Sequence, residues 1–558
     1  MTDRSDPQPS TPSPSTTIAV LPAVVSGVLA GGAALGAGEL AAAFAAPRPG
    51  PVVAVANQVI DWAPTWLVDL GKSLFGTSDV TALVIGTVIL SLVSAAVLGA
   101  RSRRSPWPTL AGIAGFGLVG LAAMGTDSQG GWAYGLVVTA VAVITGSAVF
   151  AWLRSRATRT STSPSTTITP TGAAAGAEGA KGVEGATVTD DPRDPAVSRR
   201  RFLTASGTVG VVAVAAGLGA NVLRSRSSVA DARDAVQLAD NALPEDVGAV
   251  VSGAGGDAVS STPGISPLIT PNDKFYLIDT VVLTPQIDPA NWELTIDGMV
   301  EQDLTFSYQD LLDRATTAAP VTLSCVSNEV GGNLVGNAVW QGIPLTELLD
   351  EAGIDPKASQ IASYSVDGWS CGFPTEAAYD GRTALVAVGM NDEPLPLEHG
   401  FPARLVVAGL YGYVSATKWL NRIELTTLDG FDGYWVPRGW SKLGPIKTQS
   451  RIDRPIPGSS VAEGAPVAIA GVAWSPDIGI DQVEVQIDDG PWEPAELGPS
   501  LGRDAWLQWR WTWESPTPGQ HEIRCRATDA DGETQTDALA PPAPSGATGW
   551  HTIEVTVS

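Results

Sequence analysis

The chain contains 558 residues, of which 44% are hydrophobic, and it carries a formal net charge of −25 at pH 7. Hydrophobic and acidic residues occupy different parts of the sequence: residues 1–226 hold 16 basic and 12 acidic side chains, and residues 227–558 hold 17 and 46. This acidic excess argues against nucleic-acid binding, which requires clustered Lys and Arg. Three cysteines without a CxxC pair rule out a disulfide-built scaffold.

The N-terminal part predicts an all-α transmembrane bundle. Residues 1–16 are rich in Ser, Thr and Pro and are expected to be disordered. Residues 17–153 predict a four-span membrane anchor, because they contain long apolar runs separated by polar segments. Arginines follow the second and the fourth run, so a cytoplasmic N-terminus satisfies the positive-inside rule and predicts a multi-pass protein of the cell membrane. The runs, of which the third is short, are 18–46, 80–100, 110–124 and 132–153.

Glu39 is the one carboxylate inside a predicted span. An ionisable group in hydrocarbon is costly, which makes Glu39 a candidate for a functional site. Alternatively, it lies near the end of a helix and reaches toward the headgroups. The sequence leaves both interpretations open.

Two segments connect the predicted anchor to the rest of the chain. Residues 154–198 are rich in Thr, Ser, Ala, Gly and Pro and predict a flexible linker. In residues 199–226, three arginines precede Phe-Leu and a modest apolar run, which resembles a twin-arginine translocation signal. An ordinary fifth span is the alternative. Both interpretations place the following residues outside the cytoplasm.

The acidic C-terminal part predicts two folded domains. Residues 262–450 alternate short β-branched stretches with helical ones, which is typical of an α+β domain. Residues 451–558 contain recurring strand patterns separated by turn residues, including the hairpin signal at 488–490. This second pattern predicts an immunoglobulin-like β-sandwich.

One cysteine stands out as a candidate for chemistry. The three histidines, His399, His521 and His551, lie outside the predicted spans, which excludes a membrane haem with two histidine ligands and a His-rich zinc site. Cys325 ends a β-branched strand and enters a polar, Gly-containing turn. Such a thiol is either a ligand or nucleophile, or an inert core residue. Cys371 and Cys525 are expected to be structural.

Ordered motifs then carry a resemblance to a known family. The segments 325–332, 340–345, 399–405 and 411–419 resemble the sulfite oxidase family of molybdopterin enzymes. The resemblance runs from about residue 270 to 558. Its C-terminal part is similar to that family's immunoglobulin-like dimerisation domain, which implies a homodimer.

The resemblance implies a cofactor and the residues that hold it. Molybdenum would be bound by one pterin dithiolene and by the thiolate of Cys325, since a soft thiolate suits this metal. Tyr434 matches the position of the family's active-site tyrosine; the alternative is a surface turn aromatic. Arg404 and Lys418 would bind the pterin phosphate, through a planar fork and a point charge respectively. The implied cofactor contacts are Asn272, Phe275, Tyr276, His399, Arg404, Ser415, Ala416, Thr417 and Lys418.

Some of these residues also have an ordinary structural interpretation. Arg404 could instead form an internal salt bridge, and Phe275 could pack in the core. The family's oxyanion-binding arginines match Pro271 and Val330 here, so an anionic substrate would lose charge-assisted hydrogen bonds worth ~1.5–3 kcal/mol each.

The resemblance implies a molybdenum oxidoreductase that transfers an oxygen atom at a small sulfur compound, and the predicted spans and signal place it outside the cytoplasm. Sulfite oxidation is the family expectation, and reduction of methionine sulfoxide-type compounds is the alternative. No haem motif is present in the sequence, so electrons would pass to or from a separate cytochrome or quinone-linked partner. A metal-free binding or sensor module is the non-enzymatic alternative.

Overall fold

In the computed structural model, the chain forms two compact units, residues 1–226 and 227–558, which are described separately. The structure describes residues 17–44, 48–64, 67, 70–71, 74–75, 79–127, 130–159, 195–225, 228–239, 243–252 and 257–558. The predicted disordered segment 1–16 and most of the predicted linker 154–198 lie outside the described residues.

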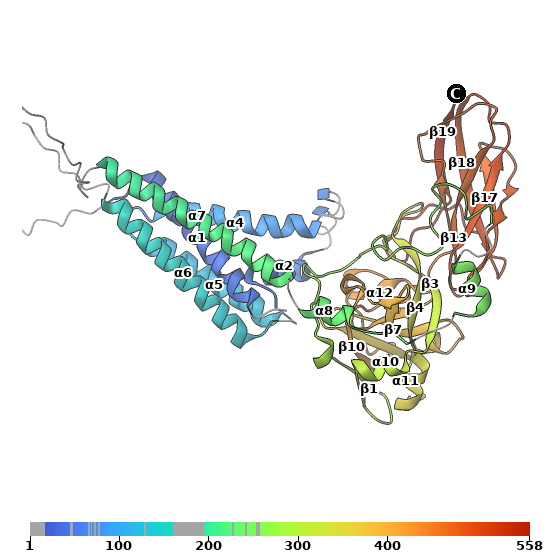
Figure 1. The fold of residues 1–558 in the computed structure, drawn as a ribbon, viewed down its shortest axis with the longest axis horizontal. Helices are drawn as coiled ribbons and strands as arrows, with labels where there is room; N and C mark the ends of the chain where they lie inside the picture. Colours follow the sequence, from blue (N-terminus) through green and yellow to red (C-terminus); the bar gives the residue numbers. More distant parts are fainter. Residues whose placement is uncertain are drawn as a thin grey trace, which may run out of the picture. The chain divides into compact units, whose positions relative to one another are not determined.

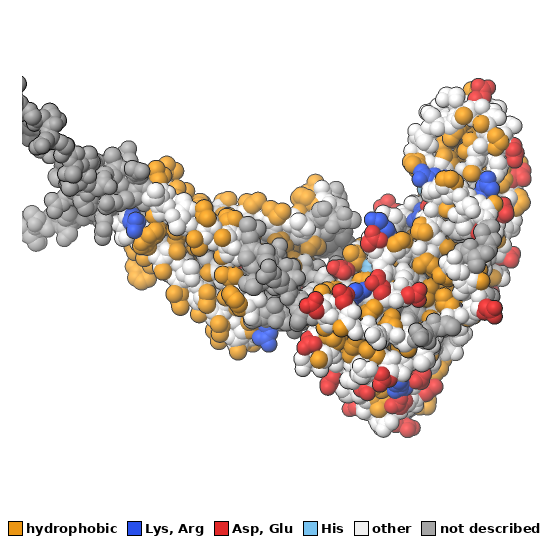
Figure 2. Space-filling model, viewed as in Figure 1, with side chains coloured by type: hydrophobic (Ala, Val, Ile, Leu, Met, Phe, Trp, Pro, Cys, Tyr) orange, Lys and Arg blue, Asp and Glu red, His pale blue; other side chains and the backbone are white. Residues whose placement is uncertain are grey.

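The described part of the first unit is helical (Figure 1). Among the described residues, four helices are long and apolar enough to span a membrane: α1, α4, α5 and α6. Helix α1 packs against α4, α6 and α7, and Figure 2 shows hydrophobic side chains over this unit. The helices of this unit are α1 (Val20–Ala43), α2 (Pro51–Trp62), α4 (Asp79–Arg101), α5 (Trp107–Thr126), α6 (Trp132–Arg159) and α7 (Pro195–Ser225).

The third apolar run, which is short in sequence, is extended at both ends in the structure. Helix α5 begins at Trp107, with Pro108 in its first turn, and continues to Thr126. Proline is favoured in the first turn because the missing N–H has no intrahelical partner there. The helix thereby reaches the length that a span requires.

Glu39 makes a local structural contact. One carboxylate oxygen accepts a hydrogen bond from the backbone N–H of Val52, at 3.0 Å, in the first turn of α2. A Cβ atom at Gly50 would overlap this carboxylate. A carboxylate at a helix N-terminus satisfies an unpaired N–H and interacts favourably with the helix dipole. Glu39 therefore joins α1 to the start of α2.

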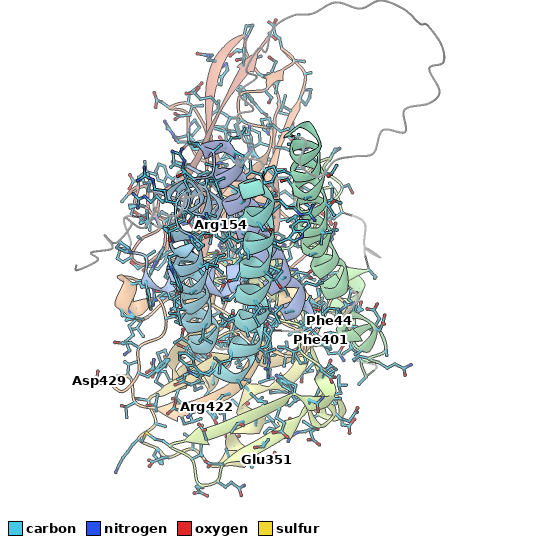
Figure 3. The ribbon with its side chains drawn as sticks, turned by 90° about the vertical axis from the view of Figure 1, so that its left-hand side faces the viewer. Phe44, Arg154, Glu351, Phe401, Arg422 and Asp429 are labelled. Atoms are coloured by element: carbon cyan, nitrogen blue, oxygen red, sulfur yellow. The ribbon has the colours of Figure 1, made fainter. Side chains whose placement is uncertain are left out.

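The α+β domain of the second unit contains two sheets around one hydrophobic core (Figure 1). The first sheet is mixed, because β1 and β10 pair in parallel, and the second is antiparallel. One sheet has the order β2-β1-β10-β5-β6, and the other has the order β3-β4-β7-β8 with β9 paired to β7. Phe401, labelled in Figure 3, is fully buried in this core against Tyr308. The strands are β1 (Glu293–Gly298), β2 (Leu304–Ser307), β3 (Thr317–Ser324), β4 (Val335–Pro344), β5 (Gln360–Ser365), β6 (Ser370–Pro374), β7 (Ala384–Met390), β8 (Glu393–Pro394), β9 (Arg404–Val407) and β10 (Leu420–Thr426).

Short helices cover and connect these sheets. Helix α10 begins with a capping box in which Ser307 and Asp310 bond to each other's backbone N–H. Helix α11 buries its leucines in the core and ends at Gly353, whose φ of 70° favours glycine. The helices are α8 (Ser228–Asp234), α9 (Glu245–Val251), α10 (Tyr308–Arg314), α11 (Leu345–Ala352), α12 (Gly412–Ser415), and the 3-10 turns η2 (Pro289–Asn291), η3 (Thr375–Ala378), η4 (Leu397–His399) and η5 (Val436–Arg438).

The C-terminal domain is a sandwich of two sheets, ordered β11-β13-β17-β16 and β12-β19-β18-β14-β15. Buried residues of both sheets pack together, with Trp509 of β17 fully buried between them. A large aromatic ring buried at this position contributes much of the apolar area that holds the two sheets together. The strands are β11 (Gln449–Arg454), β12 (Ser460–Val461), β13 (Val467–Trp474), β14 (Ile480–Ile487), β15 (Glu493–Pro494), β16 (Glu496–Leu497), β17 (Leu507–Trp513), β18 (Gly519–Asp529) and β19 (His551–Val557).

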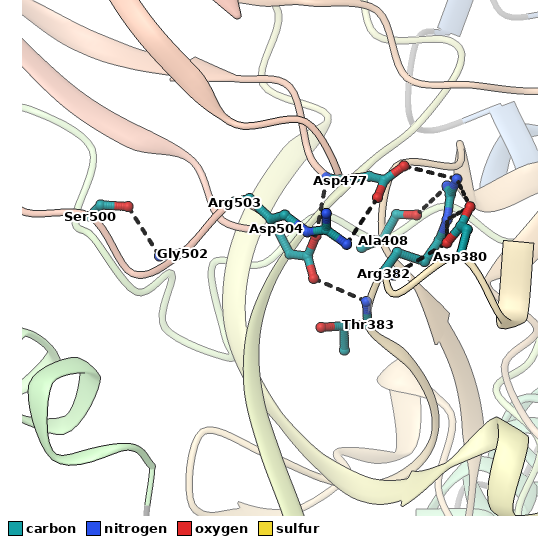
Figure 4. A network of polar contacts seen from close by, with 9 residues as sticks. All are labelled: Asp380, Arg382, Thr383, Ala408, Asp477, Ser500, Gly502, Arg503 and Asp504. Atoms are coloured by element: carbon teal, nitrogen blue, oxygen red, sulfur yellow. Dashed lines mark hydrogen bonds and ion pairs between the residues drawn. The ribbon is translucent and has the colours of Figure 1, made fainter. Parts of the chain in front are cut away.

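A polar network joins the two domains of the second unit (Figure 4). Asp504 of the sandwich accepts hydrogen bonds from the backbone N–H of Thr383, at 3.0 Å, and of Asp477, at 3.1 Å. Arg382 of the α+β domain forms an ion pair with Asp477 at 2.8 Å and donates to the carbonyl of Ala408 at 3.0 Å. Asp504 is buried, so the two N–H groups that its carboxylate accepts at this boundary are shielded from water.

We expect Asp504→Ala to destabilise the second unit by about 1–3 kcal/mol for each N–H group that it leaves without an acceptor. Thermal unfolding followed by tryptophan fluorescence measures this loss. Ser500→Ala is the matched control, because Ser500 on the same loop is exposed and its hydroxyl accepts the local Gly502 N–H at 3.1 Å. An equal loss in both variants would contradict the assignment.

Candidate active site

Cys325 is the first residue after β3, where the strand enters a closed turn. Its backbone N–H donates to the Leu334 carbonyl at 2.9 Å, and its carbonyl accepts from the Asn328 N–H at 3.0 Å. The Asn328 side chain in turn accepts from the Leu334 N–H at 2.8 Å. The buried sulfur accepts the backbone N–H of Ser327 at 3.4 Å. The turn therefore holds the thiol in a defined position, as a metal ligand requires.

Phe275 belongs to a cluster of aromatic rings next to this turn. Phe275 stacks on Tyr276 with ring centroids 5.2 Å apart and meets Trp340 and His399 edge-on at 5.7 and 5.6 Å. Phe275 is buried, and a Cβ atom at Gly336 would lie 2.8 Å from its ring. Phe275 thus has the core-packing role that the sequence left as an alternative. Its packing fixes the positions of Tyr276 and His399.

The Tyr276 phenol interacts electrostatically with both Cys325 and Arg404. Burial, together with the neighbouring Cys325, raises the pKa of the Tyr276 phenol, and the Arg404 charge opposes this rise. The phenol is therefore protonated at neutral pH and is available as a hydrogen-bond donor. The structure brings these three predicted site residues together.

Arg404 is a buried cation that begins β9. Its guanidinium donates to the carbonyls of His399, at 3.1 Å, and Leu405, at 3.3 Å, and lies 4.8 Å from the Trp340 ring centroid. Burial lowers the pKa of Arg404 to about 10, and the charges of Tyr276 and Asp279 act in the opposite direction. Within the described part of the chain, no carboxylate forms an ion pair with Arg404, so the internal salt bridge considered from sequence is not found. A buried, charged fork without a counter-ion suits a bound phosphate.

Lys418 lies beside Arg404 but has a carboxylate partner. A Cβ atom at Gly400 would lie 3.1 Å from Lys418 and 3.2 Å from Arg404, so both side chains border the same turn. Lys418 pairs with Asp279 and donates to the Glu398 carbonyl at 2.9 Å. Burial lowers the pKa of Lys418, and Asp279 opposes this. The sequence analysis missed Asp279, whose only signal is a single carboxylate in an otherwise apolar stretch.

Ser415, the last residue of α12, and the next two residues, Ala416 and Thr417, have protein partners. Ser415 donates to the carbonyls of Leu410 and Tyr411, each at 3.2 Å, and the Ala416 N–H donates to Gly412 at 3.0 Å. The Thr417 hydroxyl lies 2.6 Å from Ser363 and 3.2 Å from the Cys371 sulfur. The hydroxyls of Ser415 and Thr417 thus already form hydrogen bonds within the protein. The predicted contacts of these three residues with a cofactor stay predictions. Cys371 is fully buried, and burial raises the pKa of its thiol to about 11, which fits a structural role.

Asn272 fixes the orientation of His399. Its side chain donates to Glu393 at 2.5 Å and accepts from Asn391 at 2.7 Å. Its carbonyl lies 2.9 Å from Nε2 of His399. Burial lowers the pKa of His399 to about 4, so the ring is neutral, Nε2 carries the proton, and Nδ1 is left as an acceptor.

Tyr434 follows a tight turn. Its N–H donates to the Ser370 carbonyl at 2.9 Å, and a Cβ atom at Gly433 would lie 2.9 Å from Cys371. The Arg438 guanidinium lies 3.6 Å from the Tyr434 ring centroid and donates to the Tyr434 carbonyl at 2.7 Å. The sequence analysis did not identify Arg438; its spacing of four residues from Tyr434 is the available signal.

No group of three or more His, Cys, Asp or Glu side chains could hold a metal ion within the described ranges. A metal at Cys325 would therefore need further ligands from a bound cofactor. This fits a metal that enters as part of an organic complex with one protein thiolate.

The comparisons with known proteins agree with this geometry. Residues 281–435 match the oxidoreductase molybdopterin binding domain, and residues 449–525 match the bacterial Ig domain. Human mitochondrial sulfite oxidase is 29% identical over 343 residues, covering 52% of this chain and 62% of that protein. The uncharacterized oxidoreductase YuiH of Bacillus subtilis is 31% identical over 157 residues, covering 28% of this chain and 76% of YuiH.

A solved structure, the sulfane dehydrogenase SoxCD from Paracoccus pantotrophus, is 23% identical with a TM-score of 0.44, covering 56% of this chain and 90% of that chain. The matches confirm the predicted fold classes, apolar N-terminal helices followed by an α+β molybdopterin-binding domain and an Ig-like sandwich. The chain spans 62% of the length of the human enzyme.

The lowered pKa of His399 predicts a pH dependence of stability. The unfolded chain binds a proton below about pH 6.5 and the folded chain only below about 4, so stability present above pH 6.5 is lost as the pH falls toward 4. Between pH 7.5 and 5, we expect the free energy of unfolding to fall by about 2 kcal/mol less in His399→Gln than in the wild-type protein. Thermal unfolding at both pH values measures it.

His521→Gln is the control of opposite sign. Although partial burial opposes it, hydrogen bonds to Asp488 and Thr517 raise the pKa of His521. Its stabilisation is present below about pH 6.5 and is lost as the pH rises. In His521→Gln, the free energy of unfolding should therefore fall more steeply toward low pH than in the wild-type protein. A change of the same sign in both variants would contradict these assignments.

Proposed function

Because this chain belongs to the sulfite oxidase family of molybdopterin-binding oxidoreductases, we propose that it transfers an oxygen atom at a small sulfur compound on the outer face of the cell membrane. The carrying observation is the arrangement around Tyr276. This phenol interacts electrostatically with a buried thiol, Cys325, and with Arg404, a buried guanidinium that has no carboxylate ion pair among the described residues.

The residues that would hold the molybdenum–molybdopterin cofactor are those of this arrangement. Cys325 would supply the thiolate ligand, and Arg404 the fork for the phosphate, with Lys418 as an adjacent positive charge. When bound, the cofactor supplies the two-electron redox chemistry. Tyr276 and the Nδ1 acceptor of neutral His399 would orient polar groups of the pterin.

Tyr434 is the proposed substrate-side residue. Its phenol would donate a hydrogen bond to a substrate oxygen and assist proton movement. Arg438 lies against the same ring and adds positive charge to a strongly acidic domain. This charge would raise the local concentration of an anionic substrate such as sulfite.

A reductase of methionine sulfoxide-type compounds is the second candidate. The observation that favours it is the replacement of the family's anion-binding arginines by exposed Pro271 and half-buried Val330, which supply no charged donors. A metal-free binding module is disfavoured, because a fold without cofactor would leave Arg404 buried with no carboxylate ion pair within the described ranges.

The membrane attachment is part of the proposal. Helices α1, α4, α5 and α6 would form a multi-pass anchor with a cytoplasmic N-terminus. The Gly- and Ala-rich apolar stretch that follows three arginines and Phe-Leu in residues 199–226 supports a twin-arginine-like signal over a fifth span. The side chains of residues 195–201 lie outside the described residues, so the arginines of that signal remain a sequence prediction.

Electron transfer and assembly complete the proposal. A separate cytochrome or quinone-linked protein would exchange electrons with the cofactor, and the sandwich domain would mediate a homodimer. Both rest on the family resemblance. Neither involves nucleic acid, since residues 227–558 carry an acidic excess.

Cys325→Ser tests the central claim. In full-length protein purified in detergent, we expect molybdenum content to fall far below one atom per chain and turnover to be lost, because an alcohol is a poor ligand for this metal. Elemental analysis and steady-state assays measure both quantities. Wild-type molybdenum content and turnover in the variant would refute the proposal.

The substrate is tested on the wild-type protein. Assays with sulfite and ferricyanide, and with methionine sulfoxide and a viologen donor, separate the two candidates. We expect turnover with sulfite. Activity with methionine sulfoxide alone would replace the first candidate by the second.

Arg404→Met tests the phosphate site. We expect roughly 10–100-fold weaker cofactor retention, since a charge-assisted bond to phosphate is worth ~1.5–3 kcal/mol. Arg422→Met is the matched control, because Arg422 also lies over an aromatic ring, Tyr364 at 4.9 Å, but pairs with Asp297 at the surface. Equal cofactor loss in both variants would contradict the role of Arg404.

A further inference from the structure

A side chain of the sandwich domain is bonded to the turn that carries Cys325. Arg451 of β11 donates from Nη1 to the carbonyl of Gly332 at 2.8 Å. Its Nε pairs with Asp453 at 2.8 Å, and its Nη2 donates to the Ser266 hydroxyl at 2.8 Å. Arg451 is only 9% exposed, so these bonds are largely shielded from solvent. The guanidinium fork is thereby fixed in direction when it reaches the turn.

A second residue of the sandwich, His551, packs against Gly331, the residue before Gly332. His551 of β19 accepts the backbone N–H of Ile452 at its Nδ1, at 2.9 Å. Its ring lies against Gly331, where a Cβ atom would overlap the imidazole. Gly331 has φ of 76°, a conformation that glycine adopts without strain. The turn is therefore packed by one sandwich residue and hydrogen-bonded by another.

The contacts continue from Gly332 to the cysteine. The Gly332 N–H donates to the Glu329 carbonyl at 2.8 Å, and a Cβ atom at Gly332 would lie 2.5 Å from the Asn328 side-chain oxygen. Asn328 in turn donates its N–H to the Cys325 carbonyl at 3.0 Å. A shift of Gly332 would thus be transmitted to Cys325 within one closed turn.

We propose that Arg451 is a positioning residue for Cys325, so that the sandwich domain sets the geometry of the cysteine ligand in addition to any role in assembly. The inference rests on the proposed function, in which Cys325 binds molybdenum. The alternative is that Arg451 only holds the two domains together. The structure offers a residue for that comparison: Arg382 also joins the domains, through its ion pair with Asp477 (Figure 4).

The test compares Arg451→Met with Arg382→Met in the full-length protein in detergent. Hydrogen exchange of the segment 325–334 is measured without cofactor, and the Mo(V) electron paramagnetic resonance spectrum with cofactor. We expect Arg451→Met to accelerate exchange at the Cys325 and Leu334 amides by about tenfold or more, because it removes a charged hydrogen bond that holds the turn. The spectrum should change in the same variant. Arg382→Met should alter neither.

Other outcomes overturn the proposal. Unchanged exchange in Arg451→Met, equal acceleration in both variants, or accelerated exchange with an unchanged spectrum would each show that Arg451 does not position the ligand. Should Arg451→Met fail to accumulate, Arg451→Lys keeps the charge but cannot bond Asp453, Ser266 and Gly332 together, and the same expectations apply. The exchange measurement needs no metal, so its failure is distinct from loss of molybdenum dependence in Cys325→Ser.

Discussion

The guanidinium of Arg404 imposes the strongest constraint on the α+β domain. A buried ion costs several kcal/mol unless its charge is compensated. Here carbonyls of His399 and Leu405 and the face of Trp340 meet it, while neighbouring Lys418 pairs with Asp279. The surrounding β-strands, aromatic rings and glycine turn all serve to keep this charge in place. Of two adjacent cations, Lys418 thus has a carboxylate partner, and Arg404 is the one for which we propose a phosphate.

Local sequence patterns predicted much of the second unit. The β-branched stretch before Cys325 correctly predicted that this residue follows a strand, β3, and the strands of the sandwich follow their apolar periodicity. The apolar runs likewise became helices, although α5 is longer than its run. These features depend on neighbours in the chain, which is why composition and spacing were sufficient. The bounds proposed for the individual domains remain predictions.

The missed features are contacts between distant segments. Asp279 with Lys418 and Arg451 with Gly332 join residues more than a hundred positions apart, which no local pattern records. The hydroxyls of Ser415 and Thr417 were assigned to the cofactor from a motif, yet they bond to protein groups. A motif gives the position of a residue in the chain; the direction of its side chain depends on tertiary packing.

The packing of β19 against the cysteine turn also affects how the enzyme is made. His551 contacts Gly331, although the two residues lie 220 positions apart in the sequence. During translation, Cys325 leaves the ribosome long before β19 is synthesised. The turn therefore acquires its complete set of neighbours late, and a cofactor that binds the finished turn would have to be inserted after synthesis of the last strand.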